Sequence, residues 1–166
     1  MNFWIFGYGL RYQVINLLQS QPYYGGTNVN GSGGERGDFL TNTAAEVKYT
    51  CLVEKKPSPE ILLSKNYRNG AYSISAELSG AISQVQVNCA TWENEGSRTM
   101  HNIEKLSSIN TISPKGIVVI GMTNQLTSFD MKNTFERFRN ELHNPEIITF
   151  DELYERAKFI VEVKNT

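Results

Sequence analysis

Four consecutive apolar residues in the second half of the chain constrain its fold more than any other feature. Residues 117–120, Ile-Val-Val-Ile between Gly116 and Gly121, predict a strand that is buried on both faces. Apolar residues at helical spacing follow over 130–142, and a second short strand is predicted over 146–150. A strand, a helix and another strand in succession cross over in a right-handed sense, which makes the two strands parallel. We therefore expect a parallel strand pair here.

The remaining predicted elements alternate in the same way. Strands are predicted over 37–43 and 46–56, which can form a hairpin, and helices over 10–18, 75–92 and from the capping-box pair Thr149 and Glu152 through Val163. This order predicts an α/β fold with a central mixed β-sheet flanked by helices. The length fits a single domain of residues 1–166.

Two segments between these elements are predicted loops. Residues 25–34 are rich in glycine and asparagine, which is typical of a surface loop or of a loop that closes over a substrate backbone. No Gly-Lys-Ser/Thr follows, and this counts against a nucleotide-binding domain with a phosphate loop. The second loop is 67–70, Tyr-Arg-Asn-Gly, where Arg68 is either solvated or available to bind a phosphate.

Composition excludes some classes of protein and weighs against another. No apolar run approaches the roughly 20 residues that span a bilayer, so no membrane association is expected. Two cysteines form no disulfide framework and no zinc motif, so a reducing cytoplasm is the expected location. The net charge of -1 counts mildly against nucleic-acid binding, because phosphate binders are usually basic.

The strand over 46–56 carries residues suited to phosphodiester hydrolysis. Side chains alternate along a strand, so Glu54 and Lys56 should project from one face about 6.5–7 Å apart. Carboxylates of Glu54 and Asp38, with the backbone carbonyl of Lys55, could hold Mg²⁺. Lys56 could orient the attacking water or stabilise the charge that develops on the phosphate. We favour this electrostatic role over general-base chemistry, since an ordinary lysine has a pKa of about 10.4.

The motif has an alternative interpretation. Glu-x-Lys is frequent by chance and usually marks the solvated face of a strand. Glu46 and Lys48 form a second such pair on the same strand. Asp38, on the preceding predicted strand, favours Glu54 as its partner, because Glu46 follows it too closely with a turn between them.

Several longer stretches resemble the nuclease domain of Shedu antiphage defence proteins. The similarity spans nearly the whole chain, and its middle and tail segments are more specific than Glu-x-Lys alone. The segments that carry it are 4–7, 37–40, 52–57, 67–85, 114–121 and 146–158.

The resemblance implies a PD-(D/E)xK restriction-endonuclease-like fold that cleaves double-stranded DNA with Mg²⁺ or Mn²⁺, acts in antiphage defence and forms a homo-oligomer. The family's acidic pair and lysine correspond to Asp38, Glu54 and Lys56, and its helical glutamine corresponds to Gln84, which would bind the phosphate or the water. The chain departs from the family at Pro57, which stands three places after the glutamate instead of four. The alternative function is a catalytically impaired nuclease-fold module that binds DNA ends or a partner protein.

Overall fold

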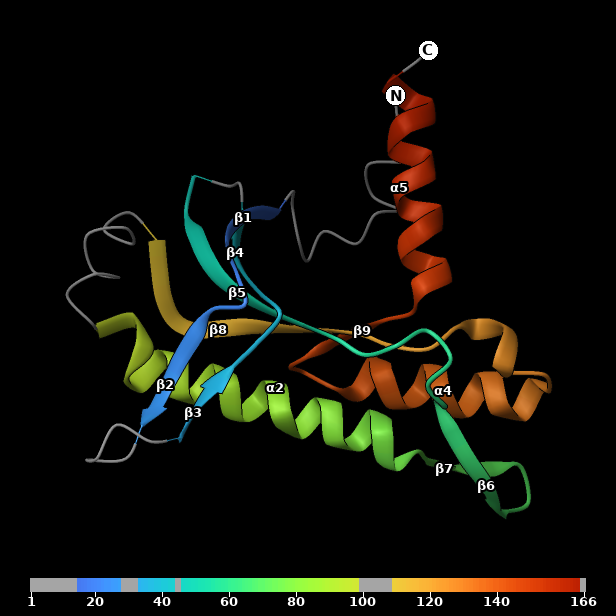
Figure 1. Cartoon of the computed structure of the whole chain (residues 1–166). Coiled ribbons are helices and arrows are strands. Elements are labelled where there is room, and N and C mark those ends of the chain that lie inside the picture. The colour runs from blue at the N-terminus through green and yellow to red at the C-terminus, as the bar shows by residue number, and fades with distance from the viewer. Residues whose placement is uncertain (1–14, 28–32, 44–45, 99–108, 165–166) are drawn as a thin grey trace. The chain divides into compact units, whose positions relative to one another are not determined.

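A computed structural model of the chain describes residues 15–27, 33–43, 46–98 and 109–164. These residues group into two compact units. Unit 1 lies within residues 1–52 and 88–115, and unit 2 lies within residues 53–87 and 116–166. Strand β5 (Lys48–Lys55), helix α2 (Ala76–Asn94) and strand β8 (Ile109–Val119) contribute residues to both units (Figure 1).

Unit 1 is built mainly from antiparallel strands. Strand β1 (Ile15–Ser20) pairs antiparallel with β4 (Phe39–Thr43), and β5 is the next strand in the sheet after β4. Strands β2 (Tyr23–Thr27) and β3 (Gly33–Arg36) form a separate two-stranded sheet, and the short helix η1 (Gly96–Arg98) follows α2. The predicted strand over 37–43 is confirmed by β4, and the prediction over 46–56 is confirmed by β5.

The core of unit 1 contains a buried aromatic pair. The rings of Tyr24 and Trp92 meet edge to face with centroids 6.0 Å apart, and the Tyr24 hydroxyl donates to the carbonyl of Phe39 at 3.2 Å. Gly37 must be glycine for this packing, because a Cβ there would lie 2.3 Å from the Tyr24 hydroxyl oxygen. The aromatic pair thus fixes the start of β4, directly after Asp38.

The predicted helix over 10–18 is wrong where the structure describes it. Residues 15–18 lie in β1, and residues 10–14 lie outside the described part of the chain. Leu17 and Leu18 are 60% and 39% exposed, so residues 15–18 contribute no buried helical stripe. Pairing with β4 satisfies the backbone of this segment, and such tertiary pairing overrides local apolar spacing.

Unit 2 contains the parallel strands. The ends of β5 and β8 and strand β9 (Glu146–Ile148) are neighbours in that order, and β8 pairs parallel with β9 as predicted. Ile117, Val119 and Ile148 form a buried cluster against which Val53 and Phe150 pack. Unit 2 also contains the hairpin β6 (Leu63–Arg68) and β7 (Ala71–Ile74), η2 (Thr123–Gln125), α4 (Phe129–Glu141) and α5 (Phe150–Lys164).

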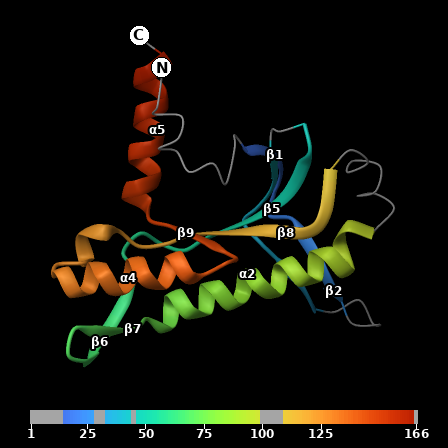
Figure 2. The same cartoon turned by 180° about the vertical axis from the view of Figure 1, so that it is seen from behind.

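The protein is therefore mixed α/β, with antiparallel and parallel strand pairs in its sheet and helices flanking the strands of unit 2. From both sides, α4 lies beside the hairpin β6–β7, while α5 runs away from β9 (Figures 1 and 2). None of the helices in the described ranges is long and apolar enough to cross a membrane.

Two predicted boundaries in unit 2 need correction. Tyr67 and Arg68 are not in a loop but in β6, and only Asn69 and Gly70 form the turn to β7. Gly70 has a φ of +78°, which favours glycine, and this explains the short connection. Strand β8 begins at Ile109, earlier than the apolar run indicated, because its first half has no such run.

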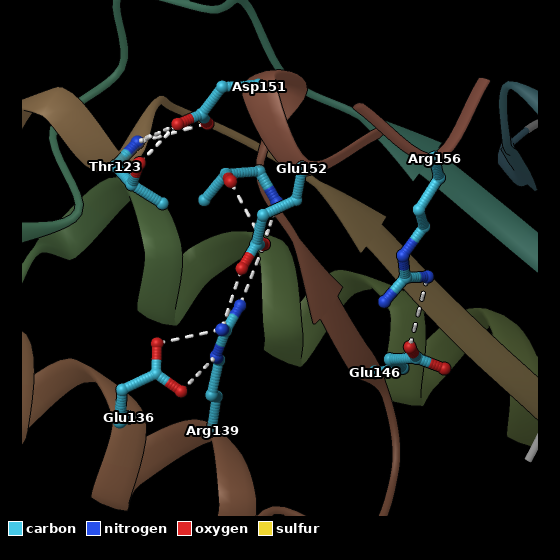
Figure 3. A network of polar contacts seen from close by, with 8 residues as sticks. Thr123, Glu136, Arg139, Glu146, Asp151, Glu152 and Arg156 are labelled. Atoms are coloured by element: carbon cyan, nitrogen blue, oxygen red, sulfur yellow. Dashed lines mark hydrogen bonds and ion pairs between the residues drawn. The ribbon is translucent and has the colours of Figure 1, made fainter. Parts of the chain in front are cut away.

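The start of α5 is joined to α4 through a polar network. The predicted capping box is confirmed, since Glu152 Oε2 accepts from the backbone N–H and the hydroxyl of Thr149, at 3.0 and 2.9 Å. Arg139 donates to both oxygens of Glu152, at 2.8 and 2.7 Å, and to Glu136 (Figure 3). Asp151, beside it, accepts from Thr123. These contacts fix α5 to the segment that follows β8.

We expect the substitution Glu152→Gln to reduce the loss of unfolding free energy that the protein undergoes at acidic pH. Burial alone would raise the pKa of Glu152, but hydrogen bonds from Arg139 and Thr149 lower it from its ordinary value. A lowered folded-state pKa adds stability that is present above the unfolded pKa of about 4.3 and is lost as pH falls through the folded value. Urea unfolding between pH 7 and pH 3 should show the wild type losing about 1.5 kcal/mol more than the variant.

Glu155→Gln provides the control for this experiment, because Glu155 is exposed on the same helix. This variant should follow the wild-type profile. Parallel profiles for wild type and Glu152→Gln would show that the network does not bias the ionisation of Glu152.

Candidate active site

Lys56 lies between two acceptor side chains in unit 2. Its Nζ is 3.0 Å from Oε1 of Glu54 and 2.8 Å from Oε1 of Gln84. Lysine offers only donors, so the amide oxygen of Gln84, and not its nitrogen, must face the ammonium group. Lys56 therefore contacts two of the other three side chains that are predicted to be catalytic.

Strand β5 buries the carboxylate of this group. Glu54 is only 6% exposed, while the neighbouring Lys55 is exposed on the opposite side of the strand. A buried carboxylate costs several kcal/mol unless it is paired, and Lys56 provides the pairing charge. Glu46, in the other Glu-x-Lys pair, is exposed. The solvated-face interpretation thus applies to Glu46 and is wrong for Glu54.

Helix α2 carries Gln84 on the border of its buried stripe. Within unit 2 this stripe consists of Leu78, Ala81, Ile82 and Val85. The helix begins after Ser75, whose hydroxyl accepts from the backbone N–H of Leu78 at 3.0 Å. Gln84 itself is half-buried, which leaves its amide group at the edge between the packed stripe and solvent.

A glycine on β8 allows α2 to approach the sheet closely. A Cβ at Gly116 would lie 2.4 Å from Cγ1 of Val85 and 2.9 Å from Cβ of Pro145. Real Cβ atoms do not approach other atoms so closely, so the helix could not keep this position beside a larger residue. Val85 directly follows Gln84, and Gly116 therefore influences where Gln84 stands.

The shortened spacing to Pro57 does not displace Lys56. Strand β5 ends at Lys55, and the backbone N–H of Lys56 donates to the carbonyl of Val119 at 2.9 Å. The chain turns away at Pro57 only after this bond to β8. Lys56 is thus held by its backbone as well as by its side chain.

Asp38 lies in unit 1, whereas Glu54, Lys56 and Gln84 lie in unit 2. It directly precedes β4, its side chain is half-buried, and its backbone carbonyl accepts from the N–H of Gln21 at 2.8 Å. Its pairing with Glu54 around a cation stays a prediction.

The donors of the predicted metal site are of the right chemical type. Carboxylate and backbone carbonyl oxygens are hard ligands of the kind that Mg²⁺ and Mn²⁺ prefer, and Glu54 and Lys55 supply one of each in unit 2. Across the described ranges, no group of three or more His, Cys, Asp or Glu side chains is placed to hold a metal ion. The predicted set has a different composition, with two carboxylates and one carbonyl.

Arg68, the predicted phosphate contact, is the last residue of β6 and is exposed. The sequence does not single out the residues before it on β6, because the predicted loop begins at Tyr67 and residues 64–66 carry no strand pattern. The available signal was Leu63, an apolar residue followed by a polar run that ends in Asn-Gly, which is typical of a hairpin.

Comparison with known proteins identifies the family. The family model described as Shedu protein SduA, C-terminal, matches residues 1–154. Shedu protein SduA of Bacillus cereus (strain B4264) is 31% identical over 150 residues, which make up 89% of this chain and 40% of that protein. The resemblance inferred from the sequence segments is thereby confirmed, and the chain belongs to the family of C-terminal regions of Shedu protein SduA.

Proposed function

We propose that this chain is a metal-dependent DNA endonuclease domain of the PD-(D/E)xK type. The observation that carries this proposal is the contact of Lys56 with both Glu54 and Gln84. A residue that serves only the fold would be apolar at the buried position of Glu54, since burying an ion pair seldom adds stability. Buried charged groups with a specific partner are typical of functional sites.

Lys56 has the geometry of a phosphate ligand. An ammonium group has three N–H donors, and Glu54 and Gln84 accept two of them. No other described side chain accepts the third, which can donate to a phosphate oxygen. Because both neighbours fix the ammonium group, its charge would need little reorganisation when negative charge develops on the phosphate.

Gln84 can position the water that attacks the phosphorus. Its amide oxygen faces Lys56, so its two amide N–H donors point away from the ion pair. A water or a phosphate oxygen can accept from them at the half-buried edge of α2. The contact with Lys56 holds the amide in this orientation.

Glu54, Asp38 and the carbonyl of Lys55 are the residues that would hold Mg²⁺ or Mn²⁺. When bound, the ion would polarise the scissile phosphate and make water more acidic. The contact with Lys56 holds the carboxylate of Glu54 in place, and carboxylate oxygens are ligands that a hard cation prefers.

The biological setting of this proposal comes from the family. We propose a role in antiphage defence, with double-stranded DNA as substrate, in a cytoplasmic homo-oligomer. The chain spans about 40% of the length of its Bacillus relative, so the activity of the whole protein is part of the proposal.

Mg²⁺ or Mn²⁺ is expected to raise the melting temperature of the wild type, and Glu54→Ala should abolish this rise. An ion at 100 times its dissociation constant stabilises the native state by about 2.7 kcal/mol, which corresponds to about 5–10 °C for a chain of this length. Thermal melts with the metal and with EDTA measure the effect. Glu46→Ala removes an exposed carboxylate and should retain the full shift.

Digestion of plasmid and linear duplex DNA with Mg²⁺ tests the reaction itself. We expect cleavage that EDTA stops. A protein that binds DNA ends or a partner protein without a metal shift and without cleavage would overturn the nuclease proposal in favour of the impaired module.

A further inference from the structure

The hairpin β6–β7 carries a strand that is exposed on both faces. Leu63 is buried, but each of the following five residues of β6, from Ser64 to Arg68, is exposed. Tyr67 is 79% exposed, more than any other large hydrophobic side chain in the part of the chain that the structure describes. The core therefore does not explain why this strand carries an aromatic residue.

The hairpin is nevertheless fixed at both ends. At its base, Leu62 is fully buried, and its carbonyl accepts from the N–H of Ser75 at 3.1 Å. At its tip, the carbonyl of Gly70 accepts from the hydroxyl of Thr134 on α4 at 3.4 Å. An exposed aromatic ring on a fixed arm is held ready for a ligand, so less conformational entropy is lost on binding.

Two unpaired cations accompany the exposed ring. Lys65 precedes Tyr67 by two residues on β6, and Arg68 adjoins Tyr67 at the turn. Neither forms a salt bridge with any described residue. One acidic neighbour of the turn is Asp130, whose carboxylate lies beside Gly70. An aromatic ring between two free cations is the chemistry that binds a single nucleic-acid strand, with stacking on a base and contacts to phosphates.

We propose that the hairpin β6–β7 binds an unpaired stretch of DNA beside the cleavage site, with Tyr67 stacked on a base and Lys65 and Arg68 on phosphates. A duplex hides its base faces, so a protruding ring gains stacking only on a frayed end, an overhang or a fork. The proposal rests on the proposed function for the position of the scissile phosphate. It names DNA with a junction between paired and unpaired strands as the substrate class.

The distance along α2 fits this arrangement. Gln84 lies nine positions after Ser75, which is at the base of the hairpin, and this offset corresponds to about 14 Å of helix. This is the axial length of about four base pairs of duplex. Tyr67 lies four residues along β6 from Leu63, which adds up to about 13 Å of strand. One DNA strand of about four to eight nucleotides could thus place a phosphate at Lys56 and an unpaired base at Tyr67.

Binding to a blunt 20-base-pair duplex and to the same duplex with an eight-nucleotide overhang tests the proposal. Fluorescence anisotropy in EDTA measures binding without cleavage. We expect the wild type to bind the overhang DNA about 10-fold more tightly, and Tyr67→Ala to lose this difference while binding the blunt duplex normally. Tyr67→Phe keeps the ring and should behave as the wild type. Removing Lys65 and Arg68 should reduce the salt dependence, by about 0.7 in the slope for each lost contact with an unpaired strand.

Tyr154→Ala is the matched control, since Tyr154 is 65% exposed on α5. It should leave both affinities unchanged. Equal affinity of the wild type for the two DNAs, or an equal loss on both in Tyr67→Ala, overturns the proposal. Cleavage assayed in parallel separates it from the proposed function. Binding that depends on Tyr67 without any cleavage would reject the endonuclease proposal and support the hairpin site. Cleavage together with binding that does not depend on Tyr67 would support the endonuclease proposal and reject the hairpin site.

Discussion

Replacing Glu54 with glutamine is expected to lower the rate of DNA cleavage at least about 1,000-fold while the protein stays folded. Glutamine has the shape of glutamate and an oxygen that can still accept from Lys56, but it lacks the charge that binds a divalent ion. Loss of a group that supports a metal ligand already costs 10–100-fold, so the loss of a ligand should cost more. Single-turnover cleavage of a labelled duplex measures the rate, and circular dichroism checks the fold.

Glu46→Gln is the control for this substitution. It makes the same chemical change at the exposed glutamate of the other Glu-x-Lys pair, near the start of β5, and should cleave at the wild-type rate. The melting temperature of Glu54→Gln should equal or exceed that of the wild type, because a buried charge has been removed. Cleavage by Glu54→Gln within a few-fold of wild type would refute the metal-binding role of Glu54.

Replacing Lys56 with alanine is expected to reduce both activity and stability. Loss of one group that stabilises charge in the transition state lowers rates about 100- to 1,000-fold. The substitution also leaves the carboxylate of Glu54 buried without its cation. Breaking a buried pair costs about 3–5 kcal/mol, but the Lys56 side chain is 30% exposed, so we expect about 1–2 kcal/mol. Cleavage rates and urea unfolding at pH 7 measure the two effects.

A double substitution separates the two effects of Lys56. Adding Glu54→Gln to Lys56→Ala removes the unpaired charge, so stability should return while activity stays low. Lys48→Ala, at the half-buried lysine of the other Glu-x-Lys pair, should change neither quantity appreciably. Normal cleavage by Lys56→Ala would remove the lysine from the mechanism, even if the protein were destabilised.

The elements that the sequence predicted correctly are those whose own pattern matches their surroundings. The run over residues 117–120 is buried because β8 has neighbours on both sides, and α2 has a continuous apolar stripe. The helix predicted over 10–18 is wrong over residues 15–18, because a strand partner, and not the local apolar spacing, determines the structure of β1. The exposed strand β6 was also missed, since its polar residues give no alternating pattern.

The candidate site was only partly accessible from local pattern. Alternation along a strand places Glu54 and Lys56 on one side, but it gives the same result for Glu46 and Lys48. Burial separates the two pairs, and burial depends on residues far along the chain. Gln84 lies 28 positions from Lys56, and only the family resemblance predicts that both belong to one site. Similarity to a family carries information about residues that are distant in sequence, whereas local periodicity carries information only about neighbouring residues.

The absence of a side chain at Gly116 helps to bring Gln84 within hydrogen-bonding distance of the Lys56 ammonium group. Because Gly116 presents only hydrogen towards Val85, the α2 backbone can settle against β8, and the amide one residue earlier comes within bonding range of Lys56. The distance between Lys56 and Gln84 therefore depends on the apolar packing of Val85 against Gly116. A larger residue at position 116 would therefore alter the candidate active site without contacting any of its polar groups.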